Sequence, residues 1–223
     1  MKRVRLAREV ALGLGVYGVY LLVRRRALSS GGRERAHRAA ERLAAFEDRL
    51  GIGQEPALQR RALRLPPRLL HGLNAGYAVF NVGLTVSWLI LLYRREDPAF
   101  ARLRRACVLA HLGAQPVFLL APVAPPRTLP RYVDTLAEVT GVDLENPLLV
   151  RFYNPIAAMP SLHLAYAVVT ASAAAERGSS RATRAVAYGY PPLVAAVVVA
   201  TGNHFVLDCA AGAALGAAAW RIA

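Results

Sequence analysis

The apolar positions of this chain fall into long runs with few or no charged residues, and arginine-rich segments separate these runs. The five longest runs are Leu69–Tyr93, Ala106–Leu120, Ile156–Ala175, Ala185–Ala200 and Phe205–Ile222. A helix needs about 20 such residues to cross the hydrocarbon core of a bilayer, and flanking arginines can extend a shorter one by snorkelling. A sixth run, Val10–Val23, lies between Arg8 and Arg24 and predicts a short span or, alternatively, a tilted interfacial helix. The pattern therefore predicts an all-α fold, a polytopic membrane helix bundle of about six transmembrane helices.

Residues 24–68 follow a different pattern, in which apolar positions recur at intervals of three and four among arginines and glutamates. The positions that carry this pattern are Ala39, Ala40, Leu43, Ala44, Phe46, Leu50 and a second piece, Ala57–Leu65. The spacing predicts amphipathic helices, which Gly51–Gly53 separates and Pro66–Pro67 ends. We expect this segment to lie in the membrane interface. The alternative is a soluble helical hairpin that packs on the protein itself.

Prolines and glycines mark the places where the predicted helices stop, bend or pack closely. Three prolines within residues 121–127 make a stiff loop that carries Arg127. Residues 128–153 are long enough for a short helix over the membrane, and loops of this length are often functional. We expect the prolines at 191–192 to kink the fifth span, and the small residues of Gly212–Gly216 to let the sixth span pack closely against a neighbour.

The net charge of +14 narrows the choice of partners. The arginines flank the apolar runs and form no basic stripe with exposed aromatic residues, so the charge indicates membrane topology and anionic lipid and argues against nucleic acid. Cys107 and Cys209 both lie in apolar runs, which indicates core packing and excludes a disulfide framework. Residues 1–26 begin like a signal peptide, but three arginines follow the apolar part directly and no small-residue cleavage site is seen, so we expect an uncleaved anchor.

Orientation follows from the arginines of the short loops. Loops 94–105 and 176–184 are arginine-rich, which places them and the N-terminus on the cytoplasmic side of the cell membrane. Loops 121–155 and 201–204 then face the outer side. The arginine-rich segment 24–68 then also falls on the outer side, which conflicts with the rule that arginines of loops stay in the cytoplasm. The length and amphipathic character of this segment weaken the conflict. We divide the chain into an N-terminal membrane anchor helix (residues 1–23), the amphipathic interfacial segment (24–68) and a membrane core (69–223).

Two polar clusters occur where the chain enters the membrane on the outer side, at residues 154–163 (NPIAAMPSLH) and 201–208 (TGNHFVLD). Ionisable groups at such places are costly and usually functional. His204 and Asp208 are four residues apart, so on a helix they share a face. A hydrogen bond from one imidazole nitrogen to Asp208 would fix the tautomer and leave the other nitrogen free as a nucleophile.

Other groups on this side supply what phosphoryl transfer through a phosphohistidine needs. His163 is placed to protonate a leaving oxygen, and Arg127 to hold a phosphate in fork geometry. Backbone N–H groups of Ser161 and Leu162, near the start of the fourth span, add to an anion site.

Each of these pieces also has a blander interpretation. A lone H-x-x-x-D on a helix is more often structural, and His111 in the third span is expected to be a hydrogen-bonded packing residue. Two histidines and an aspartate are compatible with Zn²⁺, but no third nearby His, Cys or Glu completes a closed site, so no metal is expected. A transporter with an intramembrane proton relay is a further alternative.

Three short stretches carry a resemblance to a known family. Residues 158–163 (AMPSLH) and 203–208 (NHFVLD) resemble the second and third motifs of the type-2 phosphatidic acid phosphatase superfamily, and are closest to its inositol phosphorylceramide synthase-like (inositolphosphotransferase-like) branch. Residues 125–127 (PPR) resemble the proline-arginine element that precedes those motifs in that branch. The similarity runs from the Leu50–Ile52 region to the C-terminus, and two spaced histidine motifs in the right order are fairly specific.

The resemblance implies a six-helix membrane bundle with an active site at its outer face and no required metal or other cofactor. It implies His204 as the nucleophile, Asp208 as its orienting partner and His163 as the general acid. Carried over in the same way, Arg127 is the phosphate ligand.

The chain departs from the phosphatases of the superfamily around the phosphate pocket. Those proteins have a lysine and a proline where this chain has Leu120 and Thr128, and a glycine where it has Leu162. They also have Ser-Arg where this chain has valines at 197–198. The synthase-like branch shares these absences. Either Arg127 does more of the binding, or other residues complete the pocket. The candidates are Arg151, Tyr153, Asn154 and Asn203.

The sequence thus predicts an integral membrane phosphatase or phosphotransferase that acts on phosphorylated lipids. Its expected partners are a phospholipid or lipid-phosphate substrate and the lipid bilayer. Water and an alcohol are both compatible with these residues as the acceptor, and so are different lipid headgroups. The alternative is a non-catalytic lipid-binding or transport protein that keeps the constellation for structure.

Overall fold

The computed structural model describes residues 2–29, 31–77 and 81–223. Within these ranges the regular structure is helical, apart from one isolated bridge between Val123 and Ala157. The helices of the main bundle are α1 (Lys2–Ala27), α5 (Asn81–Arg94), α6 (Ala99–Leu120), α8 (Leu162–Arg177), α9 (Arg181–Ala200) and α10 (Val206–Ile222). The remaining elements are α2 (Gly32–Arg49), α3 (Glu55–Ala62), α4 (Pro67–Ala75), η2 (Pro126–Thr128), η3 (Leu136–Thr140) and α7 (Pro147–Val150). The predicted all-α class is confirmed for the described part of the chain.

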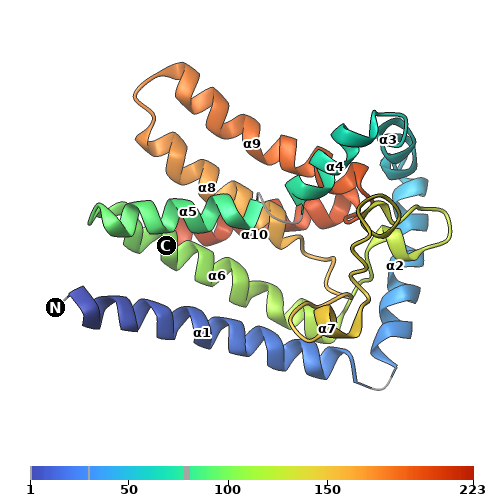
Figure 1. Cartoon of the computed structure of the whole chain (residues 1–223), viewed down its shortest axis with the longest axis horizontal. Helices are drawn as coiled ribbons and strands as arrows, with labels where there is room; N and C mark the ends of the chain where they lie inside the picture. The colour runs from blue at the N-terminus through green and yellow to red at the C-terminus, as the bar shows by residue number, and fades with distance from the viewer. Residues whose placement is uncertain (1, 30, 78–80) are drawn as a thin grey trace.

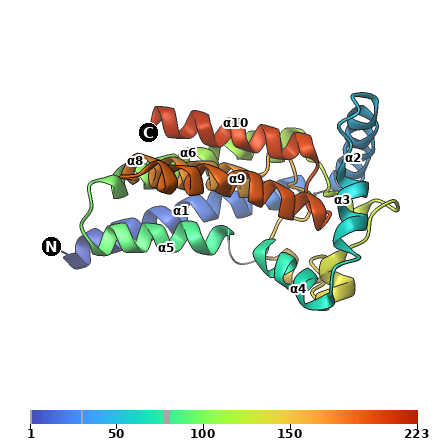
Figure 2. The ribbon, with the colours of Figure 1, turned by 90° about the horizontal axis from the view of Figure 1, so that it is seen from above.

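The bundle helices lie side by side, and α2 runs across one end of them (Figure 1). In the core, α8 packs against α9 and α10, while α6 packs against α1 and α10. The N- and C-termini both lie at the end of the bundle opposite to α2, α3 and α4, as the view from above also shows (Figure 2). The turns between α5 and α6 and between α8 and α9 lie at the same end as the termini (Figure 1). The two arginine-rich loops therefore share one end of the molecule.

Among the described helices, two are long and apolar enough to cross a membrane. They are α1, over Val4–Ala27, and α9. The part of α5 from Val82 to Arg94 is a shorter apolar helix. The predicted span Leu69–Tyr93 corresponds to two helices, α4 and α5, on either side of residues 78–80, which lie outside the described residues. The number of six transmembrane helices stays a prediction.

Two bundle helices begin at other residues than predicted. Helix α6 starts at Ala99, earlier than predicted, and the Asp97 carboxylate just before it accepts the Ala99 N–H at 2.9 Å. Helix α8 starts at Leu162, later than predicted, because Ser161 is its N-cap and accepts the Leu164 N–H at 3.3 Å. This late start puts the histidine of the first cluster in the first turn of α8.

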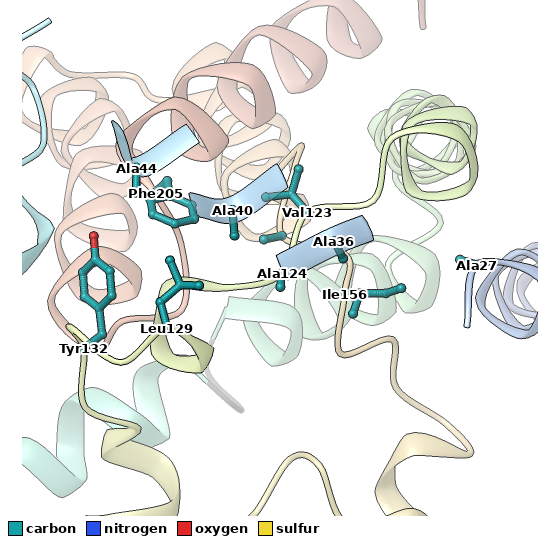
Figure 3. Packing of buried hydrophobic residues seen from close by; sticks show 11 residues of the cluster. Ala27, Ala36, Ala40, Ala44, Val123, Ala124, Leu129, Tyr132, Ile156 and Phe205 are labelled. Carbon is teal, nitrogen blue, oxygen red and sulfur yellow. The ribbon is translucent and has the colours of Figure 1, made fainter. Parts of the chain in front are cut away.

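Helix α2 buries its small residues on the protein itself (Figure 3). Its buried alanines, Ala36, Ala40 and Ala44, belong to a core cluster that includes Phe205. The other buried members of this cluster are Ala27, Val123, Ala124, Leu129, Tyr132, Ile156 and Ala158. Phe46, which was expected on the apolar face, is 50% exposed. The covered alanine face favours the alternative interpretation, a helical hairpin packed on the protein, over a helix that is buried only in the membrane interface.

Helices α8 and α10 approach each other more closely than side chains would allow. A Cβ atom added to Gly212 would lie 2.2 Å from the carbonyl oxygen of Ser161, and one added to Gly216 would lie 2.5 Å from that of Ala165. Backbone therefore meets backbone at both glycines, and the close packing predicted for this stretch is confirmed. The contact fixes the start of α10 beside the start of α8.

Candidate active site

Two histidines meet where α8 and α10 begin. The Nε2 atom of His204 lies 3.3 Å from the Nδ1 atom of His163. The ring of Tyr77 stacks on His163 with 4.7 Å between the ring centroids. Burial, and then the positive charge of Arg127, lower the pKa of His204 to about 3. The resting imidazole is therefore neutral, which is the form that a nucleophile requires.

Asp208 lies behind His204 on the first turn of α10. Its Oδ2 atom is 3.4 Å from His204 Nδ1 and accepts the Phe205 N–H at 2.9 Å. The structure thus brings the predicted His–Asp pair together, with Nδ1 toward the carboxylate and Nε2 toward His163. In this pose Nε2 is in contact with the second histidine, whereas Nδ1 makes no hydrogen bond among the described residues and faces the Asp208 carboxyl group.

Arg127 is buried next to the histidines, and its guanidinium contacts three side chains. It donates to Asn203 Oδ1 at 2.7 Å and to the Tyr153 hydroxyl at 3.2 Å, and its Nε lies 3.3 Å from Asp134 Oδ2. The Arg127 N–H also donates to the Gly202 carbonyl at 2.7 Å. Arg127 is therefore fixed to the loop that carries His204, and Asp134 offsets part of its charge.

A cavity of about 450 Å³ opens beside the two histidines. Four of the predicted phosphate-binding residues line it, namely Leu162, Asn203, Tyr153 and Asn154. The Nδ2 atom of Asn154 is buried and has no hydrogen-bond partner among the described residues. This amide is a donor that the fold leaves available for a ligand.

Two other predicted phosphate ligands are placed differently. The Ser161 N–H is already used, because it donates to the Asp208 carbonyl at 3.0 Å, and its hydroxyl caps α8. Ser161 thus joins the starts of α8 and α10, and the expectation that its N–H binds the anion is wrong for this geometry. Arg151 is exposed and is not among the residues that line the cavity.

Two buried glutamates that the sequence reading did not single out hold the start of α10. Glu47 Oε1 accepts the Leu207 N–H at 2.6 Å, and Glu55 Oε1 accepts the Val206 N–H at 2.8 Å. These are N–H groups that a helix start leaves without partners in its own helix. The signal for Glu47 is present in the sequence, since it continues the stripe of Ala36, Ala40 and Ala44 at helical spacing.

Aromatic residues from α1 also reach the cavity, which the sequence did not indicate. Tyr17 and Tyr20 line it, and the Tyr20 hydroxyl accepts the Asn154 N–H at 2.7 Å. On the facing helices, His111 Nδ1 lies 2.6 Å from the Tyr166 hydroxyl. The expectation that His111 is hydrogen-bonded is confirmed, and the residue lines the cavity as well.

Comparison with known proteins gives one match. A family model described as the PAP2 superfamily matches residues 41–222, which is most of the chain. No curated protein and no solved structure matches. Among the described residues, no group of three or more His, Cys, Asp or Glu side chains is arranged to hold a metal ion. The matched range includes both histidines, Asp208 and Arg127, and excludes α1.

Proposed function

The chain belongs to the PAP2 superfamily, and from this membership we propose that it is an integral membrane phosphatase or phosphotransferase that acts on phosphorylated lipids through a phosphohistidine. Membership by itself points to a phosphatase-type enzyme. The observation that carries the finer proposal is the pairing of His204 Nε2 with His163 Nδ1 at 3.3 Å, with Asp208 behind the first ring.

In the first step, a substrate phosphate takes the place of the direct contact between the two rings. His204 Nε2 attacks phosphorus while the bond to the leaving oxygen breaks. His163 takes up a proton from the phosphate monoanion as it binds and donates that proton to the leaving oxygen, and Asp208 stabilises the positive charge on His204 through Nδ1–H. In this proposal the Asn154 amide, which lines the cavity, and Arg127, which does not line it but donates to the lining residues Asn203 and Tyr153, stabilise the phosphate oxygens.

In the second step, an acceptor oxygen attacks the phosphohistidine. His163, which is now neutral, removes the acceptor's proton, and the P–N bond to His204 breaks. Water as acceptor gives a phosphatase, and an alcohol gives a phosphotransferase. The valines at 197–198 and Leu162, which this chain has in place of Ser-Arg and glycine, favour the inositol phosphorylceramide synthase-like branch.

The test is turnover by the purified protein in detergent micelles. Phosphatidic acid, phosphatidylinositol and other phospholipids are supplied with and without myo-inositol or glycerol as alcohol acceptors. We expect release or transfer of phosphate, and acid-labile phosphate on the wild-type protein after a rapid quench. His204→Ala abolishes both. Turnover of none of these lipids, or turnover that persists in His204→Ala, would instead favour the non-catalytic lipid-binding alternative.

The same assay examines the metal question separately. The proposed mechanism needs no metal ion, so activity should persist in a chelator. Activity that is lost in a chelator and restored by Zn²⁺ would move the assignment to metal-assisted hydrolysis.

A further inference from the structure

A second hollow adjoins the cavity at the histidines. Its volume is about 600 Å³, and it shares two lining residues, His111 and Tyr166, with the catalytic cavity. The two hollows are therefore neighbours across this hydrogen-bonded pair. The first holds the polar groups of the proposed site, and the second is bordered mainly by aliphatic and aromatic side chains.

The second hollow is a groove whose walls are α1 and α5 and whose floor is α6. Along α1 its lining runs from Val16 through Gly13 to Leu6, and along α5 it runs from Val86 to Tyr93. The residues of these two helices that line the catalytic cavity continue each series, with Tyr17 and Tyr20 on α1 and Val82 on α5. The groove therefore extends from the cavity at the histidines along both helices.

The length and ends of the groove limit what it can hold. At about 1.5 Å per residue, the lined part is ~16 Å long on α1 and ~12 Å long on α5, so the longer wall is about half the hydrocarbon thickness of a bilayer. Charged side chains line it only near its far end, where Arg104 donates to Glu9 Oε1 at 2.5 Å. A chain of methylene groups matches this shape, since it is apolar along its length and needs no hydrogen bonds.

From this continuity we infer that the groove between α1 and α5 binds an acyl chain of the lipid whose phosphate reacts at His204. The inference rests on the proposed function and adds the substrate class, a phosphorylated lipid with a long acyl chain. Helix α1 lies before the residues that the family model matches. The selectivity of this protein for the acyl chain is therefore set in part by α1, a helix outside the range that the family model matches.

The experiment fills the groove at a glycine. A Cβ atom at Gly13 or at Gly15 would meet nothing within 4 Å, so a larger side chain leaves the backbone from open space at both positions. Gly13 lines the groove and Gly15 lines none of the described hollows, which makes Gly15→Leu the matched control. Val86→Trp fills the same groove from the α5 wall and is a second, independent variant.

The first readout does not depend on turnover. A phosphatidic acid with a photoreactive diazirine at the end of one acyl chain is incubated with the protein and irradiated, and the labelled peptides are identified. We expect labelling on the groove helices α1, α5 and α6, also in inactive His204→Ala. We expect Gly13→Leu and Val86→Trp to reduce it about tenfold, because each buried methylene that is lost lowers the affinity roughly fourfold. Gly15→Leu should label like the wild type.

The second readout compares dihexanoyl and dipalmitoyl phosphatidic acid as substrates. The loss of kcat/KM in Gly13→Leu should be greater for the longer chains. Labelling spread over other helices, or equal labelling in Gly13→Leu and Gly15→Leu, would overturn the acyl-chain assignment. Absent turnover with normal α1 and α5 labelling would count against the proposed function and leave the groove assignment standing.

Discussion

At the scale of single residues, the two histidines have unequal chemical tasks. In the proposed mechanism His204 forms the bond to phosphorus, while His163 protonates the leaving oxygen. The second task matters less as the leaving group becomes a weaker base. We expect His163→Ala to lower kcat about 10²–10⁴-fold with a lipid phosphate, but far less with p-nitrophenyl phosphate, whose leaving group needs no proton. His204→Ala should abolish turnover of both substrates.

Steady-state kinetics of the two variants with the two substrates measure this difference. Tyr17→Phe is the control, because it changes a residue that lines the cavity and leaves the imidazole rings of His163 and His204 intact. Equal losses with both substrates in His163→Ala would show that His163 only positions its partner. If His204→Ala still turned over p-nitrophenyl phosphate, His204 would not be the nucleophile.

The residues of the site could be predicted from the sequence to different degrees. His204 and Asp208 are separated by one helical turn, so their pairing is a local property that spacing reveals. Glu47 is 160 positions from Leu207, whose N–H it binds. Such a contact depends on how α2 crosses the bundle end, and no local pattern carries that information. The donor role expected for Ser161 failed for the same reason, since its N–H is taken by a residue of α10.

At the scale of the element, the start of α10 is held by carboxyl groups that repel one another. Glu55 and Asp208 face Glu47, and burial, with the neighbouring Glu55 carboxyl, raises the pKa of Glu47 from 4.5 to about 8. The folded state therefore binds this proton more tightly than the unfolded chain does. The resulting stabilisation is complete below the unfolded pKa and is lost as the pH rises through about 8.

Thermal unfolding in detergent from pH 6 to pH 9 should therefore show a Tm that falls as the pH rises. Glu47→Gln should flatten this dependence, because the amide oxygen still accepts the Leu207 N–H and carries no titrating proton. Glu34→Gln on the same helix is the control, since Glu34 pairs with Arg38 on the exposed side. A slope that is unchanged in Glu47→Gln would contradict a protonated Glu47.

The contact of α8 with α10 is the second element that the site depends on. Gly212→Ala places a Cβ atom 2.2 Å from the Ser161 carbonyl oxygen, so the two helices must separate. We expect a loss of about 1–3 kcal/mol in stability and a lower kcat, because His163 and His204 are carried by these two elements.

Gly189→Ala in α9 is the matched control for that substitution. A Cβ atom at Gly189 meets nothing within 4 Å, so alanine there should raise helix stability by about 0.5–1 kcal/mol. Unfolding midpoints and kcat are measured for both variants. If Gly212→Ala retained wild-type stability and kcat, the two helices would not need this close approach.

At the scale of the whole molecule, hydrophobic patterning predicted which residues form helices better than it predicted what those helices pack against. The last three predicted runs each contain most of one helix, because an apolar run bounded by arginines, proline or glycine has little choice of structure in a membrane. The run Leu69–Tyr93 divides into α4 and α5, which composition alone does not reveal. The position of α2 depends on alanines that meet the loops 121–132 and 156–158, and such a tertiary contact has no periodic signal.

The arrangement of the ends makes the predicted membrane orientation testable. Ser29 follows α1 at the end that carries α2, and Ser179 lies in the turn between α8 and α9 at the end that carries the termini. Both residues are exposed. In a background with Cys107→Ala and Cys209→Ala, a membrane-impermeant maleimide should label Ser29→Cys in intact cells. Ser179→Cys should be labelled only after the membrane is permeabilised.

The physical reason for this expectation is the arginine content of the two turns at the terminal end, which favours the cytoplasmic side for them. Long segments cross the membrane largely regardless of their charge, so the folded α2 and α3 region is not retained inside by its arginines. The reverse labelling pattern would place the two histidines on the cytoplasmic side, and with them the lipids that can reach the site. Labelling of both positions in intact cells would contradict a bundle that spans the membrane. The outcome therefore decides which leaflet supplies the acyl chain for the groove between α1 and α5.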